Sequence, residues 1–527
     1  MVSVGVAAAL SACAASGGPP APYASAAEQQ AAMRAGRTTA EALVRQDLAR
    51  IEALDRHGPR LNSVLALDPG ALGEARRLDA DRRAGRALGP LHGVPILIKD
   101  NIESAGPLPT TAGSLALAAN VTGRDAPIVR RLRAAGAVIV GKANLSEWAN
   151  FRSSSSISGW TPIAGLVRNP YVLDRSACGS SSGSGAAVAA GLVTAAIGTE
   201  TDGSITCPAA FNGVVGLKPT LGLVPRTFVV PISAEQDTPG PMTRTVADAA
   251  AVLAAIAGSD PADPATAEAD AHKADYLGAL DPGALKGARI GVVKLNAGRS
   301  RQVDAAFDAA VEVLRKAGAV LVEVKPTDDK LAGQIGEAEE KALLSEFRAS
   351  INAYLAAAPA AVTTRSLDDL IAFDRREPRE TAIFGQELFE QAAKAPPLTD
   401  PAYLAARESA RRLARGELDR MIVQARVEAI VAPTAAPAFY DDPVDGPNWL
   451  GSASNLPAVS GYPHLTLPMG QASGLPLNIS FIGPRWSEAR LLALGYAFEQ
   501  ATHARFEPRF YPSVAAEPEM ARAIDPR

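Results

Sequence analysis

A stretch rich in glycine, serine and alanine, residues 176–220, constrains this chain more than any other part of it. It holds two turns of small residues, at 178–185 and 199–205, separated by an alanine-rich run at 186–196. Glycine permits backbone conformations in which main-chain N–H groups point at a ligand, and serine side chains are short. A serine nucleophile needs a base and oxyanion donors beside it. The stretch therefore indicates a hydrolytic site whose base comes from elsewhere in the chain.

The order of motifs in this stretch resembles that of the amidase signature family, a group of serine hydrolases with a Ser–Ser–Lys triad. The family pattern is a glycine- and serine-rich loop, an alanine-rich helix, T-(D/E)-T-G-G-S-I, a proline and V-G-L-K-P-T. The matching segments here are GSSSGSG at 179–185, TETDGSI at 199–205, Pro208 and VGLKPT at 215–220. The resemblance covers roughly residues 30–500 and implies the family's fold and chemistry.

The resemblance gives three residues catalytic roles. Ser204 takes the place of the nucleophile, and Ser180 that of the bridging serine, which in the family lies on a cis peptide bond. Lys99 takes the place of the family's lysine, because VPILIKDN at 94–101 fits an apolar strand followed by Asp-Asn. The oxyanion donors are expected to be the backbone N–H groups of Thr201, Asp202 and Gly203. Ser181 is expected to support the site through hydrogen bonds.

The chemistry requires Lys99 to be uncharged. Its reference pKa of about 10.4 keeps a lysine charged in water. Burial behind the apolar residues 96–98 would lower that pKa and make a neutral amine available. Ser180 would then relay a proton from Ser204 to Lys99 while an acyl-enzyme forms. None of the five histidines lies in the glycine-serine stretch, and no metal-site spacing is found, so we expect neither a metal nor a cofactor.

Two other motifs resemble known sites. Residues 136–142 imitate a P-loop, but Ala143 replaces its Ser/Thr and residues 137–140 look like a strand. The sequence GSSSG at 179–183 satisfies G-x-S-x-G, so Ser181 is the alternative nucleophile, as in an α/β-hydrolase esterase with His464 or His503. The segment before Ser181 is a poor central strand, which disfavours this alternative.

The sequence departs from the family pattern at two positions, and the second departure bears on substrate choice. Asp202 stands where many members have glycine, and Thr206 where many have an arginine that could steer a carboxylate. The motifs CGSSSGS and ETDG, with segments at 346–355 and 374–377, resemble the peptide-amidase branch, whose members remove C-terminal amides. We therefore expect an amidase that acts on small-molecule or peptide amides. The alternatives are a catalytically dead binding protein and an amidotransferase glutaminase of the A type, which passes ammonia to a partner protein.

The chain beyond the signature predicts an α/β fold, a large mixed β-sheet core covered by helices on both faces, because apolar strands alternate with helices. We expect one amidase domain over 26–510, with a signature core at about 90–245, a helical insertion at about 328–426 and a tail at 511–527. A capping box at Thr38-x-x-Glu41 predicts the start of the first helix. The segment DTPGPM at 237–242 resembles the D-x-x-G-P-M turn of the family, which implies a turn there. Strands are expected at 63–67, 94–99, 137–140, 290–293, 320–324, 429–434, 465–468 and 478–483, and helices at 74–86, 125–135, 245–256 and 303–317.

The N-terminus indicates export. Residues 2–16 form an apolar run that suits a secretory signal and is too short to span a bilayer. LSAC at 10–13 resembles a bacterial lipobox, which would make Cys13 a lipid anchor. We therefore expect a signal or lipoprotein segment and linker at 1–25, a periplasmic or lipid-anchored protein, and no transmembrane span.

Charge and cysteine content limit the expected partners and covalent links of the chain. Acidic and basic residues nearly balance, 56 against 52, without a basic cluster studded with aromatic residues, so nucleic acid is not an expected partner. Besides Cys13 the chain has only Cys178 and Cys207. We expect these two to be small buried thiols. The alternative is a disulfide between them, formed in an oxidising compartment.

Overall fold

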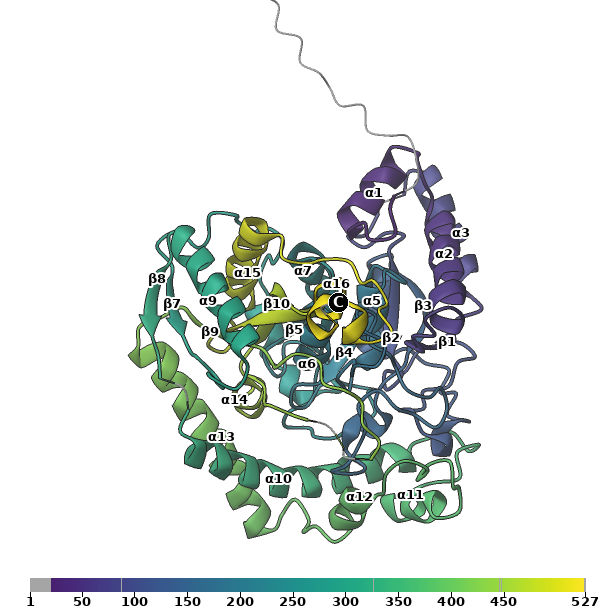
Figure 1. Ribbon diagram of the computed structural model, residues 1–527. Coiled ribbons are helices and arrows are strands. Elements are labelled where there is room, and N and C mark those ends of the chain that lie inside the picture. Colours follow the sequence, from purple (N-terminus) through teal and green to yellow (C-terminus); the bar gives the residue numbers. More distant parts are fainter. Residues whose placement is uncertain (1–19, 87, 326, 445, 447, 526–527) are drawn as a thin grey trace, which may run out of the picture.

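One mixed sheet of eleven strands organises the molecule (Figure 1). The computed structural model describes residues 20–86, 88–325, 327–444, 446 and 448–525. The strand order is β1-β3-β2-β4-β6-β5-β10-β11-β9-β7-β8. The strands are β1 (Val64–Leu67), β2 (Pro95–Lys99), β3 (Val138–Ala143), β4 (Ala195–Glu200), β5 (Val215–Lys218), β6 (Thr238–Thr243), β7 (Arg289–Val292), β8 (Val320–Glu323), β9 (Ala429–Pro433), β10 (His464–Ala472) and β11 (Leu475–Ile482).

Both faces of this sheet are covered by helices, which confirms the predicted α/β fold. Side chains alternate between the faces along β2, so Ile96 and Ile98 join one apolar core and Leu97 joins another. The first core contains α4 (Pro127–Ala134), α7 (Val246–Ile256), α9 (Arg301–Lys316) and α15 (Glu488–Thr502). The second contains α5 (Ser182–Ala189) and α6 (Thr206–Phe211). The remaining α-helices outside the insertion are α1 (Ala26–Arg34), α2 (Ala40–Arg50), α3 (Ala71–Arg83), α8 (Ala269–His272), α14 (Asn455–Ser460) and α16 (Pro518–Ile524).

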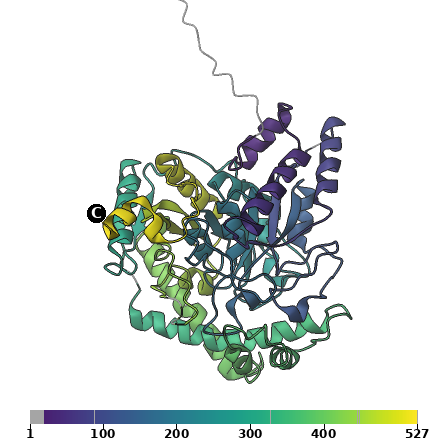
Figure 2. The same cartoon turned by 45° about the vertical axis from the view of Figure 1, so that its right-hand side comes forward.

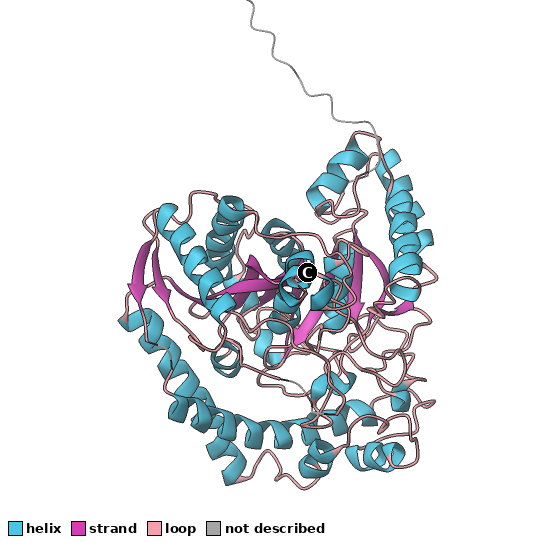
Figure 3. Cartoon of the chain, in the orientation of Figure 1, coloured by secondary structure: helices cyan, strands magenta, loops and turns pink. Residues whose placement is uncertain are grey.

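The segment expected as a helical insertion forms a belt of helices along one side of the sheet (Figures 1 and 3). It contains α10 (Asp329–Ala356), α11 (Leu367–Asp374), α12 (Glu387–Ala392) and α13 (Pro401–Asp419). Figure 2 shows the same belt below the sheet after the molecule is turned. A third apolar core, which includes Phe347 of α10 together with Trp148 and Ile232, fixes the belt to loops of the sheet domain.

Three local predictions were wrong. Thr39, not Thr38, caps α2, and its side chain accepts a hydrogen bond from the N–H of Ala42. The turn expected at 237–242 is mostly strand β6, because the backbone there pairs with β4 along its whole length. Within β6, only Met242 and Thr243 pair with β5, whereas the whole strand pairs with β4. Residues 238–241, which include both prolines, therefore have a strand neighbour on one side only, as at a sheet edge.

The third wrong prediction concerns the alanine-rich run at 186–196, which the family pattern implies to be a helix. Helix α5 ends at Ala189, and Gly191 has a positive φ of 64° that ends the helical path. The chain then enters β4 at Ala195, a strand that the composition did not reveal.

The described residues begin at residue 20, so most of the export segment expected at 1–25 lies outside them. Cys13 also lies outside the described residues. Within the part that the structure describes, no helix has the length and apolar character needed to cross a membrane.

Gly240 tests how tightly the central sheet is packed. A Cβ atom added there would lie 2.0 Å from the carbonyl oxygen of Leu217 on the neighbouring strand. Gly240→Ala should therefore destabilise the fold by about 3 kcal/mol, since overpacking displaces the backbone. Gly333→Ala is the control, because a Cβ on this exposed residue of α10 meets no atom within 4 Å. It should leave the melting temperature unchanged or raise it slightly. Equal melting temperatures of the two variants would contradict the packing described.

Candidate active site

Lys99 is the last residue of β2 and points to the sheet face that carries α5 and α6. This follows from its spacing of two residues from Leu97, whose side chain packs in that core. Lys99 is fully buried. Its Nζ lies 2.7 Å from Ser180 Oγ and 2.9 Å from Thr199 Oγ1. The structure therefore joins the predicted lysine directly to the predicted bridging serine.

Burial lowers the pKa of Lys99 to about 7, because it disfavours the ammonium form. The negative charges of Asp237 and Glu200 oppose this shift without cancelling it. Among the described residues, no carboxylate forms an ion pair with Lys99. A substantial fraction of the amine is thus neutral at physiological pH, which a lysine base requires.

The two predicted serines lie on segments that touch. The peptide bond between Gly179 and Ser180 is cis. A Cβ at position 179 would lie 2.2 Å from Ser146 Oγ, so the close approach of the loop to its neighbour requires glycine there. The N–H of Ser181 donates to the carbonyl oxygen of Ser204 at 3.1 Å. Ser204 is 8% exposed and lines a pocket. Ser180, which contacts Lys99, therefore lies on a segment hydrogen-bonded to that of Ser204.

The predicted oxyanion turn, residues 201–203, leaves its main-chain donors available. Gly203 has a positive φ of 76°. No described residue accepts a hydrogen bond from the N–H groups of Thr201, Asp202 or Gly203. The turn is held instead by its side chains and carbonyls, including a 2.6 Å hydrogen bond from Thr201 Oγ1 to Asp237 Oδ1. N–H groups without acceptors beside a serine are suited to bind a developing oxyanion.

Ser181 and two other buried lysines, Lys142 and Lys218, have partners outside the candidate triad. The hydroxyl of Ser181 donates to the Thr199 carbonyl at 3.1 Å and accepts from the Thr199 N–H at 3.2 Å. Lys142 is a residue of β3 and donates to the Ile102 carbonyl, which rules out a flexible phosphate-binding loop at this position. Lys218 donates to the carbonyl of Pro219 at 3.0 Å.

Sequence reasoning missed several groups that support the site. Thr199 contacts the Lys99 amine with its hydroxyl, and Asn101 Nδ2 donates to the same hydroxyl at 3.0 Å. Glu200 Oε2 accepts the N–H groups of Ile205 and Thr206 at 2.8 and 2.9 Å. These residues belong to the motifs KDN and TETDGSI, so the signal was present, but the pattern does not say which side chains meet.

The pocket that contains Ser204 has a volume of about 320 Å³, within the range of small-ligand sites. Carboxyl groups of Asp202, Asp441 and Asp442 line it, and none of its described lining residues is Lys or Arg. Burial raises the pKa of Asp441 to about 7. Aromatic side chains at the pocket are Phe151, Phe439 and Trp449. Among the described lining residues the insertion helices contribute only Leu343, and loops at 149–158 and 439–454 form most of the wall.

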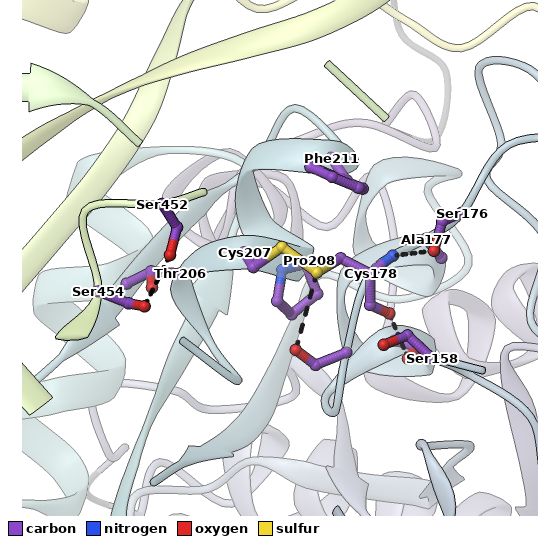
Figure 4. Close-up of a disulfide and its surroundings, with 12 residues drawn as sticks. Ser158, Ser176, Ala177, Cys178, Thr206, Cys207, Pro208, Phe211, Ser452 and Ser454 are labelled. Carbon is purple, nitrogen blue, oxygen red and sulfur yellow. Dashed lines mark hydrogen bonds between the residues drawn. A yellow bond between two sulfur atoms is a disulfide. The ribbon is translucent and has the colours of Figure 1, made fainter. Parts of the chain in front are cut away.

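A disulfide joins Cys178 to Cys207 at the pocket (Figure 4). The expectation of two free thiols was wrong, because the loop before Ser180 and helix α6 after Ser204 bring the sulfurs together, with 5.9 Å between their Cα atoms. In Figure 4 Ser158 lies to one side of the bond and Ser452 and Ser454 to the other. The disulfide thus closes a ring of chain that contains both candidate serines.

The chain matches known proteins over most of its length. The family model described as Amidase matches residues 42–492. A probable amidase of Arabidopsis thaliana is 40% identical over 470 residues, which are 87% of each chain. The A-type subunit of the glutamyl-tRNA(Gln) amidotransferase of Synechococcus is 35% identical and aligns over 90% of this chain and 92% of its own.

The solved structures include the native peptide amidase of Stenotrophomonas maltophilia. It is 51% identical to this chain, superposes with a TM-score of 0.87, and the alignment covers 93% of this chain and 99% of that one. Its likeness, the matched family model and the mixed sheet confirm the resemblance drawn from the motifs. The chain belongs to the amidase family and is a hydrolase that acts on amide carbon–nitrogen bonds.

Proposed function

We propose that this amidase hydrolyses the C-terminal amide of peptides, releasing ammonia and the free acid through an acyl-enzyme on Ser204. The observation that carries the proposal is the 2.7 Å hydrogen bond between Lys99 Nζ and Ser180 Oγ beside a pocket that contains Ser204. It joins a lysine of lowered pKa to a hydroxyl that can relay a proton.

The reaction uses the neutral amine of Lys99 as the base. Ser180 gives its proton to Lys99 and takes the proton of Ser204, whose oxygen attacks the amide carbon. The oxyanion is stabilised by N–H groups of the turn at 201–203. The proton returns along the same path to the leaving nitrogen, and ammonia departs. Water then attacks the acyl-enzyme with the same base and releases the acid.

The charge of the pocket supports a peptide amide over glutamine. Free glutamine carries a carboxylate besides its ammonium group, and that carboxylate would find acidic lining residues and no described basic one to pair with. Thr206, where many family members have arginine, turns its hydroxyl to Glu200 at 3.2 Å. The end of a peptide amide is uncharged and meets no such repulsion. The 51% identity to a peptide amidase supports the same substrate class.

The contacts of Ser181 disfavour it as the nucleophile. Both hydrogen-bonding sites of its hydroxyl are occupied by the main chain of Thr199. A nucleophile elbow also requires a strand directly before the serine, and residues 173–180 form none. His464, one of the proposed bases, donates to or accepts from Ser480 Oγ at 2.6 Å, and burial lowers its pKa to about 3.

We also propose that the protein is exported. The disulfide supports this, because disulfides persist in oxidising compartments such as the periplasm and are rare in the cytosol. The apolar N-terminal segment agrees with the same location.

A substrate panel tests the function. The wild-type protein should release ammonia from peptide amides much faster than from glutamine, aryl amides or esters. Ser204→Ala should reduce the rate at least about 10⁴-fold, because the nucleophile is lost. Ser181→Ala is the comparison and should reduce the rate far less, because its hydroxyl only helps to hold the Thr199 main chain. Ammonia release that survives Ser204→Ala and disappears in Ser181→Ala would move the nucleophile to Ser181. A preference for glutamine, dependent on partner proteins, would favour the amidotransferase.

The pH dependence tests the base. Because only the neutral amine accepts a proton, kcat/KM should rise with pH along an acidic limb centred on the Lys99 pKa of about 7. Lys99→Ala should abolish the rate at every pH. Activity that is flat from pH 5 to 8 would contradict a lysine base, and so would a rise centred near pH 10.

Removal of the disulfide tests its contribution to the site. Cys178→Ser with Cys207→Ser opens a ring whose ends are 29 residues apart and should cost about 3 kcal/mol of stability. The melting temperature should fall, and kcat should fall with it, since both serine segments loosen. Reductant should lower the wild-type melting temperature and leave the double variant unaffected. A wild-type melting temperature that stays constant after both thiols have become titratable would contradict this role.

A further inference from the structure

Glu339 is a buried acid of the insertion that reaches the oxyanion turn. It lies on α10 and is 5% exposed. Two side-chain amides donate to its carboxyl group, Gln236 Nε2 to Oε1 at 2.7 Å and Asn455 Nδ2 to Oε2 at 2.6 Å. These amides come from two different parts of the chain, the segment before β6 and the start of α14. Glu339 therefore ties three elements together beneath the pocket.

Each of the two amides also holds the oxyanion turn. Gln236 Nε2 donates to the Thr201 carbonyl at 3.3 Å, and Asn455 Nδ2 donates to Asp202 Oδ2 at 2.9 Å. Gln236 is itself held by α13, because Arg407 donates to its Oε1 at 3.0 Å. The orientation of the turn thus depends on a carboxyl group that lies outside the signature motifs.

We propose that Glu339 is a positioning residue for amide hydrolysis, which holds the turn at 201–203 so that its N–H groups point at the pocket. The inference rests on the proposed function, because it assumes that these N–H groups bind the oxyanion. Glu339 does not line the pocket, so it acts through Gln236 and Asn455.

The charges around Glu339 give this role a pH signature. Asp202 shares the Asn455 amide with it, Arg407 faces it from α13, and Lys218 faces Asp202 from β5. Burial raises the pKa of both acids, and the negative charge of Asp202 adds to the effect on Glu339, whose pKa rises to about 8. Below that pH the pair keeps a proton. Above it, a second negative charge lies next to the oxyanion turn and opposes the charge that forms in the transition state.

Glu339→Gln tests the proposal, with Glu340→Gln as the matched control on the exposed next residue of α10. The substrate is a peptide amide, or whichever amide of the panel the wild type hydrolyses. The wild type should show a bell-shaped kcat/KM profile with its alkaline limb near pH 8. Glu339→Gln should lower kcat on the order of tenfold with KM within about threefold, since a misaligned donor is lost mainly in the transition state. It should also lose the alkaline limb, and Glu340→Gln should match the wild type.

Wild-type kcat and an unchanged alkaline limb in Glu339→Gln would overturn the proposal. If this variant fails to fold, Asn455→Ala decides, because it removes the same link to Asp202. It should lower kcat with little change in KM, and a wild-type kcat would overturn the proposal. A wild type that hydrolyses another amide of the panel but no peptide amide would overturn the proposed substrate class. The role of Glu339 would then be tested with the amide that is hydrolysed.

Discussion

The arrangement of this molecule depends on one interaction, the contact of a buried lysine amine with a serine hydroxyl. An ammonium ion without a carboxylate partner is costly to bury, so the site favours the neutral amine. Strand β2 enforces the burial, because its side chains alternate between two apolar cores and place Lys99 beside α5 and α6. The hydroxyl groups of Ser180 and Thr199 then supply the polar partners that a buried amine needs.

A second requirement is that main-chain N–H groups near the nucleophile stay without acceptors. Such groups are normally paired inside a protein. Here the turn at 201–203 is held by other atoms, through Asp237, Gln236 and Asn455. Glu200 accepts the N–H groups at the start of α6, just after the nucleophile. The neighbouring residues therefore use their own hydrogen bonds to keep the turn in place and leave its donors for the substrate.

The pocket is the part of this chain that bears on its substrate. The family includes enzymes as different as peptide amidases and tRNA amidotransferases, and members of both kinds resemble this chain over most of its length. The fold alone does not separate them. In this chain the pocket is lined by three aspartates and by no described lysine or arginine, which disfavours a substrate carboxylate there.

The motifs of the sequence determined the fold class, the family and the residues of the candidate triad. Spacing along the chain carries that information, because Lys99 ends an apolar strand and the two serines lie in glycine-rich turns. Sequence also indicated most strands and the helical character of 328–426. It misjudged β6 and β4, whose residues form strands only because neighbouring strands pair with them.

Only the tertiary structure decided which distant side chains meet. The bond between Cys178 and Cys207 exists because the fold brings together two segments that local sequence cannot relate. The same holds for Glu339, which lies in a charged helix with nothing to mark it apart from its exposed neighbour Glu340. Burial and long-range contact give such residues their roles, and these properties belong to the packed molecule rather than to the order of residues nearby.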